Sequence, residues 1–356
     1  MKKTNGKSIE TGFVIGGILG LMSNVVCQAE IKEENPDRKF DFKSLILAGI
    51  LGSIIGAVSF GIIDFLLSVF TSKEEILDER DEISYLASVL KTYEPNEVDR
   101  EVLIKGRRIK NAINERFGFD LLGRATYQGS KAVGTALSGL SDLDILIKFK
   151  KTSFYQTREM YFELYNFLKH NFKDPDLISV RQQKVSIGLI FNIKGSEEII
   201  DVVPSLRTDF EKGKNDYHLY KNPIFSRGST KLKMNPHKQK DLGDFEKEKI
   251  EVIKLVKILK SQERLPLKSI LITELTKRAF EEIKMPKELN QILLKVLEYI
   301  KDNILTIQVK SPDNARVSLT DLIPFEEKKE IKNVLDKVLS NIKYNKKYLV
   351  DYFPEK

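Results

Sequence analysis

Two aspartates lie two positions apart at the start of an apolar run that extends from Leu143 to Ile147. Alternate side chains of a β-strand point to the same face, so Asp142 and Asp144 are predicted to share one face. Two carboxylates this close repel each other, and their pairing alone contributes nothing to folding. Carboxylate oxygens are hard ligands that suit Mg²⁺ or Mn²⁺, and a divalent cation is the usual reason for such a pair. The pair therefore predicts a metal-dependent site.

A Gly-Ser turn precedes this pair. Residues 126–128 are expected to end a strand, and residues 131–136 are expected to form a short helix. Gly129 allows close approach of the backbone, and Ser130 is expected to cap the helix and present its hydroxyl. Backbone N–H groups at a helix start bind phosphate. An ordinary turn followed by two solvated aspartates is the alternative, but a phosphate cradle beside metal ligands is typical of nucleotidyl transfer.

Two metal ions need a third carboxylate, and Asp201 is the best candidate. It lies within an apolar, β-branched run, residues 198–203, that predicts a buried strand. A lone aspartate there is costly to bury unless it is paired or binds a metal. Residues 185–193 predict the preceding strand, so a hairpin would bring Asp201 into the same sheet, and Pro204 is expected to end the second strand. The alternative is a strand-end aspartate that caps a turn.

These residues resemble the polymerase-β-like nucleotidyltransferase superfamily, whose pattern is a Gly-Ser turn, an Asp-x-Asp pair and a third Asp on a later strand. The Gly-Thr-Ala sequence at 134–136 and the Gly-x-Ser-Asp-x-Asp sequence at 139–144 are most similar to one branch. That branch holds bacterial cyclic-oligonucleotide synthases (CD-NTases), cGAS, 2′-5′ oligoadenylate synthetases and archaeal-type CCA-adding enzymes. Asp201-Val-Val-Pro204 is similar to its third-carboxylate strand. The resemblance covers roughly residues 85–350.

The resemblance implies a role for each of these residues. Asp142 and Asp144 would bind two cations about 3.5–4 Å apart. Asp201 would hold the cation at the attacking hydroxyl and help to deprotonate that hydroxyl. The β- and γ-phosphates of a nucleoside triphosphate would be held by Gly129 and Ser130, with Gln128 nearby.

Two further matches lie in the C-terminal part of the chain. Residues 252–260 resemble the helix in which a lysine, by position Lys257, meets the donor triphosphate. Ser269, at the start of the next helix, would touch phosphate, and Glu274 in that helix would be structural. The alternative for Lys257 is a place on the solvated face of an amphipathic helix.

The amino-acid composition limits which other kinds of site and partner are possible. The chain has 356 residues, of which 41% are hydrophobic, so it can bury a sizeable core. Its single cysteine, Cys27, excludes a disulfide framework and cysteine-based zinc sites. The three histidines are scattered without ligand spacing. A net charge of +8 suits a polyanionic partner but does not choose among nucleotides, RNA and a lipid surface.

The N-terminal region carries a separate signal. Residues 12–29 and 45–70 are apolar, and a charged segment separates them. A membrane span needs about 20 apolar residues, so residues 11–71 predict a two-helix transmembrane hairpin after a polar tail, residues 1–10. Glycines recur at close-packing spacing, which could join the two helices or join protomers in a homo-oligomer. The alternatives are a signal peptide cleaved near Ala29 and a buried hairpin in a soluble protein.

Charges that flank the hairpin do not fix its orientation. Nucleoside triphosphates and Mg²⁺ are cytosolic, so the catalytic domain is expected on the cytosolic side of the inner (cytoplasmic) membrane. The predicted order after the hairpin is a connector helix (72–97), a nucleotidyltransferase core (98–205) and a helical C-terminal lobe (206–356). Helices are expected near 83–93, 98–117, 153–170, 245–261, 269–282, 286–303 and 325–341, whereas 206–240 is expected to be loop-rich and basic. The fold class is α+β, a small mixed sheet with a helical lobe and a cleft between them.

The function that the resemblance implies is synthesis of cyclic or linear oligonucleotide second messengers from nucleoside triphosphates. The predicted hairpin favours a membrane-anchored enzyme of bacterial anti-phage signalling, for which RNA is not required. Three alternatives stay open: tailing of RNA, nucleotidyl transfer to a small molecule such as an aminoglycoside, and a membrane effector that only senses nucleotide. The intact set of carboxylates argues against the last of these, because a pure sensor has no need of all three.

Overall fold

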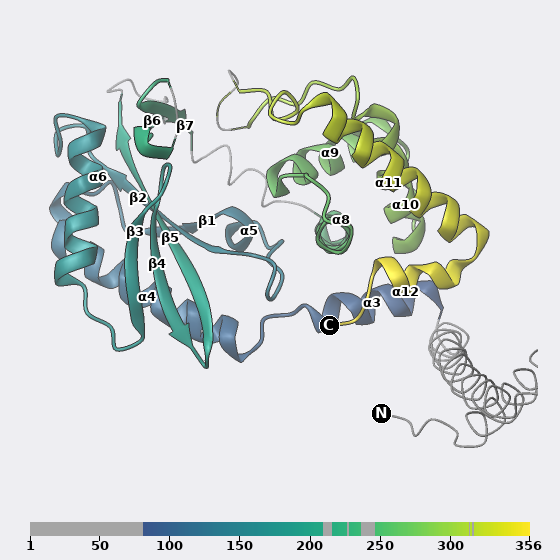
Figure 1. Ribbon diagram of the computed structural model, residues 1–356, viewed down its shortest axis with the longest axis horizontal. Helices are drawn as coiled ribbons and strands as arrows, with labels where there is room; N and C mark the ends of the chain where they lie inside the picture. Colours follow the sequence, from purple (N-terminus) through teal and green to yellow (C-terminus); the bar gives the residue numbers. More distant parts are fainter. Residues whose placement is uncertain (1–80, 209–215, 226–227, 236–245, 313, 315–316) are drawn as a thin grey trace, which may run out of the picture. The chain divides into compact units, whose positions relative to one another are not determined.

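The computed structural model describes residues 81–208, 216–225, 228–235, 246–312, 314 and 317–356 (Figure 1). The predicted polar tail and transmembrane hairpin lie outside these residues, as do residues 72–80 of the predicted connector. Within the ranges that the structure describes, no helix is long and apolar enough to cross a membrane. Residues from Glu82 to Lys356 belong to one compact unit.

A mixed sheet forms the first half of this unit. Its strands are β1 (Thr126–Gln128), β2 (Leu143–Phe149), β3 (Leu177–Gln182), β4 (Ile187–Ile193), β5 (Ser196–Arg207), β6 (Tyr217–Tyr220) and β7 (Lys231–Met234). The order is β1-β2-β5-β4-β3, and β6 pairs with β5 and β7. β2 and β5 run parallel, and the other neighbours are antiparallel. The predicted mixed sheet is therefore confirmed.

The long strand β5 confirms one prediction and corrects another. β4 and β5 form the predicted hairpin, closed by Lys194 and Gly195, whose φ values of 52° and 87° suit a two-residue hairpin turn. The prediction that Pro204 ends the strand is wrong, because β5 continues to Arg207. β5 pairs with β4 up to Val202 and with β6 from Ser205, so Pro204 lies where the strand changes partners on that side.

The region after β5 is more ordered than its sequence suggests. Residues 206–240 were expected to be loop-rich, yet β6 and β7 lie within them and extend the sheet. Both strands are only four residues long, and lysines alternate in β7, so neither produces a strong apolar signal.

The helices agree closely with those expected from the sequence. They are α3 (Glu82–Thr92), α4 (Glu97–Phe117), α5 (Gly129–Ala132), α6 (Thr157–Asn166), α8 (Lys247–Gln262), α9 (Ser269–Glu282), α10 (Leu289–Asn303), α11 (Phe325–Tyr344) and α12 (Leu349–Tyr352). A π-helical turn, Phe167–Asn171, continues α6. Asn96 starts α4 in a capping box with Asp99, each side chain accepting from the other's backbone N–H. The helix expected over 131–136 is shorter and begins earlier, at Gly129.

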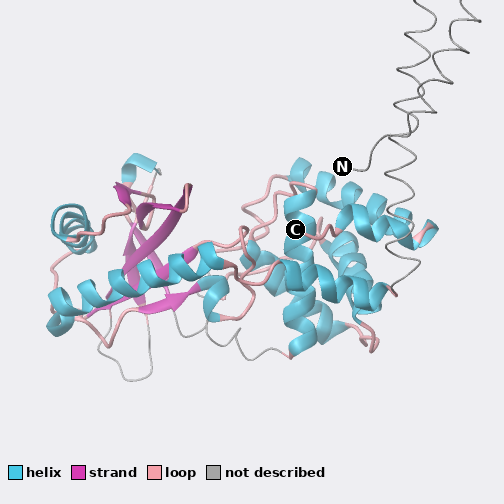
Figure 2. Cartoon of the chain, turned by 90° about the horizontal axis from the view of Figure 1, so that it is seen from below, coloured by secondary structure: helices cyan, strands magenta, loops and turns pink. Residues whose placement is uncertain are grey.

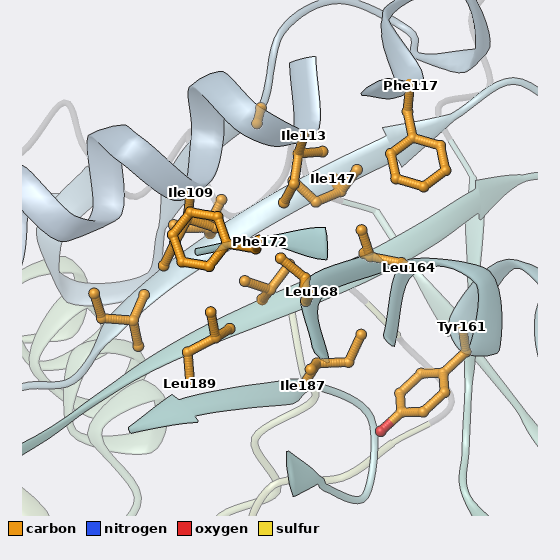
Figure 3. Packing of buried hydrophobic residues seen from close by; sticks show 14 of the residues in the cluster. Ile109, Ile113, Phe117, Ile147, Tyr161, Leu164, Leu168, Phe172, Ile187 and Leu189 are labelled. Atoms are coloured by element: carbon orange, nitrogen blue, oxygen red, sulfur yellow. The ribbon is translucent and has the colours of Figure 1, made fainter. Parts of the chain in front are cut away.

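One face of the sheet is buried under α4 and α6. Figure 3 shows Ile109 and Ile113 of α4 and Leu164 of α6 meeting Ile147 of β2 and Leu189 of β4. The opposite face carries a smaller apolar cluster, formed by Leu146, Val203, Leu219 and Met234. The strands gather in one part of the unit and helices α8–α11 in another (Figure 2). The predicted α+β class, with a C-terminal helical lobe, is confirmed.

Candidate active site

The sheet register aligns three of the predicted site residues in one row. Gln128 of β1 lies opposite Asp144 of β2, and Asp144 lies opposite Asp201 of β5. Directly paired residues on neighbouring strands point to the same face. In an antiparallel pair such as Gln128 and Asp144 the Cβ atoms lie about 4.5–5.5 Å apart. Asp142 comes immediately before the first residue of β2, and its side chain is exposed. The β4–β5 hairpin thus brings the third carboxylate beside the Asp-x-Asp pair.

The charges of these carboxylates oppose one another. Burial raises the pKa of Asp144 to about 7, and the nearby charges of Asp201 and Asp142 add to the shift. Burial and the charge of Asp142 also raise the pKa of Asp201, against hydrogen bonds from Gln183 and Ser186 that lower it. Without a cation, part of this site is therefore protonated near neutral pH.

The Gly-Ser turn lies against Asp144. Gly129 has a φ of +64°, and a Cβ at this position would come within 2.6 Å of Asp144 Oδ2. Glycine is therefore needed here for its conformation and for its size. The expectation that Ser130 caps the following helix is wrong: α5 begins at Gly129, Gln128 is its N-cap without a side-chain bond, and Ser130 lies in its first turn.

A cleft opens between the sheet and the helical lobe, as the sequence predicted. From the sheet and the turn it is lined by Gln128, Gly129, Ser130, Asp142 and Asp144, and from α8 and α9 by Lys257 and Ser269. Figure 1 shows α5, which carries Gly129 and Ser130, beside the sheet on the side of α8. Asp201 is not among the lining residues and lies in the sheet next to Asp144. The structure thus brings seven of the eight predicted site residues to one cleft, and the eighth, Asp201, is paired with one of them.

Lys257 is held by the loop that follows α5. Only 6% of the residue is exposed, and its Nζ donates to the carbonyl oxygen and hydroxyl of Thr135 at 2.9 and 3.0 Å. Burial lowers its pKa to about 8, with contributions from Lys260 and Lys254. The alternative of a solvated helix face is therefore wrong. Contact with a triphosphate stays a prediction, because the observed bonds go to Thr135.

The other two residues of the helical lobe differ in their surroundings. Ser269 is exposed at the first position of α9, and its backbone carbonyl accepts a hydrogen bond from the Thr273 hydroxyl at 3.1 Å. Glu274 is half-buried, and its Oε1 has no hydrogen-bond partner among the described residues. Burial raises the pKa of Glu274. Its expected structural role therefore remains a prediction.

Several residues around the site were not identified from the sequence. Lys148 lines the cleft on the stripe that starts with Asp142 and Asp144, so its period-two spacing could have revealed it. Thr135 and Thr273 also line the cleft, and Gln183 and Ser186 contact Asp201 from the turn between β3 and β4. These four carry no local signal, because only the tertiary fold brings them to the carboxylates.

The donor set suits a hard divalent cation. Asp201 Oδ1 and Gln128 Oε1 are buried without a hydrogen-bond partner among the described residues, and Asp144 is paired with Asp201 across the strands. Oxygen donors of this kind favour Mg²⁺ or Mn²⁺. In the same described ranges, no group of three or more His, Cys, Asp or Glu side chains is close enough to form a complete metal cluster. The fit rests on Asp144 and Asp201, with the exposed Asp142 at the edge of the cleft.

Comparison with known proteins adds information about the fold. No protein-family model matches the sequence, and no curated protein matches it. Solved structures do match. The Escherichia coli MS115-1 CdnC in complex with HORMA-deltaN has a TM-score of 0.60 and 18% identity, over 78% of this chain and 99% of that chain.

Two other bacterial structures show the same likeness. The CD-NTase CdnG of Bradyrhizobium diazoefficiens, in complex with GTP, has a TM-score of 0.59 and 13% identity, over 76% of this chain and 95% of that one. The Elizabethkingia meningoseptica CdnE cyclic dinucleotide synthase, with GTP and Apcpp, has a TM-score of 0.51 and 17% identity, over 66% and 90%. This chain has the CD-NTase fold. The branch expected from the sequence is thus supported at the level of the fold.

Proposed function

We propose that this chain is a nucleotidyltransferase that joins nucleoside triphosphates into cyclic or linear oligonucleotides with release of pyrophosphate. The observation that carries the proposal is the register that aligns Gln128, Asp144 and Asp201 beside the Gly129 turn. The shared fold supports it, because the E. meningoseptica protein is a cyclic dinucleotide synthase and the B. diazoefficiens protein was solved with GTP.

The proposed reaction is a substitution at the α-phosphorus of a nucleoside triphosphate. A hydroxyl of the acceptor nucleotide forms a bond to phosphorus, the bond to pyrophosphate breaks, and the hydroxyl loses its proton. The turn at Gly129 and Ser130 would bind the departing phosphates through backbone N–H groups and the serine hydroxyl. Asp201 is the candidate acceptor of the proton, because it is the third carboxylate of the row and lies directly opposite Asp144.

Asp142, Asp144 and Asp201 would hold Mg²⁺ or Mn²⁺, which would neutralise triphosphate charge and lower the pKa of the attacking hydroxyl. Lys257 and Ser269 line the same cleft as Asp142 and Asp144 and would contribute charge and hydrogen bonds to the same triphosphate. The protein's own contribution is therefore to orient the two nucleotides and to exclude water between the sheet and the helical lobe.

Incubation of the detergent-solubilised full chain with four labelled nucleoside triphosphates and Mg²⁺ or Mn²⁺ tests this proposal. We expect pyrophosphate release and phosphatase-resistant products without added RNA. The double variant Asp142→Asn with Asp144→Asn should abolish both and keep the fold. Asp321→Asn, which changes an exposed carboxylate of the helical lobe, is the matched control and should be active.

Other outcomes of this experiment favour other functions. Label that appears only on added RNA would indicate an RNA-tailing enzyme, and label on an added aminoglycoside a small-molecule nucleotidyltransferase. Pyrophosphate release by the double variant at the normal rate would contradict the site assignment. No turnover with any substrate, together with leakage of dye from liposomes, would indicate a membrane effector that senses nucleotide.

We also propose that residues 11–71 anchor the chain in the inner membrane with residues 82–356 on the cytosolic side, where they would serve anti-phage signalling. The apolar composition of residues 12–29 and 45–70 supports the anchor. The full chain should sediment with membranes after a high-salt and carbonate wash, and protease added to spheroplasts should leave residues 82–356 intact. Release by carbonate would contradict anchoring, and digestion would contradict the orientation.

A further inference from the structure

Asp201 has different neighbours on its two sides in the sheet. On the β2 side it faces the carboxylate of Asp144, and on the β4 side it faces Gly188. Repulsion from Asp144 would turn its side chain away from the position that a shared cation needs. An interaction on the β4 side is therefore required to hold the carboxylate in place.

Gln183 fills the space that Gly188 leaves open. A Cβ at Gly188 would come within 2.5 Å of Gln183 Nε2 and 3.4 Å of Asp201 Oδ1. The amide group of Gln183 therefore lies over the glycine and beside the carboxylate. Gly188 has an ordinary φ, so its role here is to make room for this side chain and not to permit a special backbone conformation.

Ser186 makes the second contact. Its Oγ lies 3.4 Å from Asp201 Oδ2 and also within hydrogen-bond distance of Gln183 Oε1. The serine hydroxyl has a single proton, so it donates to one of these two acceptors at a time. Ser186 is 6% exposed, so water does not easily replace either contact. The serine contact involves Asp201 Oδ2, whereas Oδ1 is buried without a hydrogen-bond partner among the described residues.

Tyr161 of α6 fixes the turn that carries both residues. Its hydroxyl donates to the Ser186 carbonyl at 2.8 Å and accepts from the Gln183 backbone N–H at 3.1 Å. The ring lies in the core under the sheet, and its oxygen points out of the cluster (Figure 3). Burial raises the pKa of Tyr161 to about 12, so the hydroxyl keeps its proton at neutral pH. The position of the turn is therefore set by the core and not by solvent.

We propose that Gln183 and Ser186, held by Tyr161, are positioning residues that orient the Asp201 carboxylate for binding of the divalent cation. These three residues are called the Asp201 brace. This inference rests on the proposed function, because it assigns a cation to Asp201. A purely structural role, in which the same bonds only close the turn between β3 and β4, is the competing explanation. The two differ in their effect on metal affinity.

Mn²⁺ binding to the full chain, measured from the EPR signal of free Mn²⁺, separates these explanations without reference to catalysis. Ser186→Ala is expected to weaken Mn²⁺ binding about tenfold, the usual effect of removing a residue that orients a metal ligand. Gln183→Met keeps the length of the side chain, removes its amide and should have a similar effect. Tyr161→Phe keeps the ring and should weaken binding about two- to fivefold.

Ser205→Ala is the matched control. Ser205 is also a buried serine, four residues beyond Asp201 on β5, and its hydroxyl donates to the Ile147 carbonyl at 2.8 Å within the sheet. We expect it to lose thermal stability but to bind Mn²⁺ within about twofold of the wild type. If Ser186→Ala loses stability, Gln183→Met still reports on affinity, because Gln183 is only half-buried.

The results distinguish failure of the brace from failure of the proposed function. Equal Mn²⁺ affinity in wild type, Ser186→Ala and Gln183→Met would overturn the brace and leave the proposed function intact. Absence of Mn²⁺ binding by the wild type would also overturn the brace. Normal Mn²⁺ binding that the brace variants weaken, with no pyrophosphate release from any nucleoside triphosphate, would support the brace and contradict the proposed reaction.

Discussion

At the scale of single residues, the strongest effect of a substitution on activity is expected at Gly129. Its φ of +64° disfavours any side chain, and a Cβ would come within 2.6 Å of Asp144 Oδ2. Gly129→Ala should therefore displace the Asp144 carboxylate, and a displacement of about 1 Å in an active site costs roughly 100-fold in rate. Pyrophosphate release measures this loss.

Gly123→Ala provides the control. Gly123 has a φ of +78° and no neighbour within 4 Å of an added Cβ. It therefore has the same conformational cost, about 1–3 kcal/mol, without the contact. Equal loss of activity in the two variants would show that the contact between Gly129 and Asp144 has no part in the effect.

The buried carboxylate Asp144 predicts an unusual dependence of stability on pH. Its pKa is raised to about 7, so the folded state binds this proton more tightly than the unfolded state. The resulting stability is fully present below the ordinary pKa and is lost as the pH rises towards 7. In EDTA, the melting temperature of the wild type should therefore fall between about pH 4 and pH 7 and level off above that.

Asp144→Asn should flatten this fall, because asparagine has no proton to lose. Each pKa unit corresponds to about 1.4 kcal/mol, and partial hydration reduces the effect, so we expect a difference of about 2–6 °C at pH 8. Mg²⁺ should restore the wild type and leave the variant unchanged. A profile shared by wild type and Asp144→Asn would contradict the raised pKa.

At the scale of elements, α8 is tied to the loop after α5 through Lys257 and Thr135. A double-mutant cycle with Lys257→Met and Thr135→Val should show a coupling of about 0.5–3 kcal/mol in unfolding free energy, because the two residues lose one shared interaction. Lys254→Met, a half-buried lysine of the same helix, should show no coupling to Thr135. Loss of activity in Lys257→Met without coupling would indicate that the lysine acts on the triphosphate alone.

The same scale shows which elements can be predicted from the sequence. α8 to α11 have long apolar periodicities, and β4 and β5 are long apolar runs, so all were predicted within a few residues. β6 and β7 are too short to carry such a signal. The end of β5 was predicted wrongly at Pro204. The proline is accommodated where β5 changes its partner from β4 to β6, and β6 could not be predicted from the sequence.

Some residues of the candidate site could be predicted from the sequence, and others could not. Asp142, Asp144 and Asp201 could be identified because charges in apolar strands are conspicuous in a sequence. Gln183 and Ser186 could not, because an ordinary polar turn reaches Asp201 only after β3, β4 and α6 have packed.

At the scale of the whole molecule, residues 82–356 should fold without the preceding segment. The sheet core and the helical lobe find their buried partners within this compact unit. A chain that starts at Glu82 should show one cooperative thermal transition and retain pyrophosphate release, while it loses association with membranes. A broad, non-cooperative transition would show that residues 1–81 contribute to the core.

The place of β5 in the sheet has a consequence for motion. β5 pairs with β2 on one side and with β4 and then β6 on the other, so its amides should exchange with deuterium only on global unfolding. Asp142 lies before the first residue of β2, where exchange through local opening is expected. We therefore expect Asp201 to be the rigid carboxylate of the proposed site and Asp142 to be the one that can adapt to a bound nucleotide.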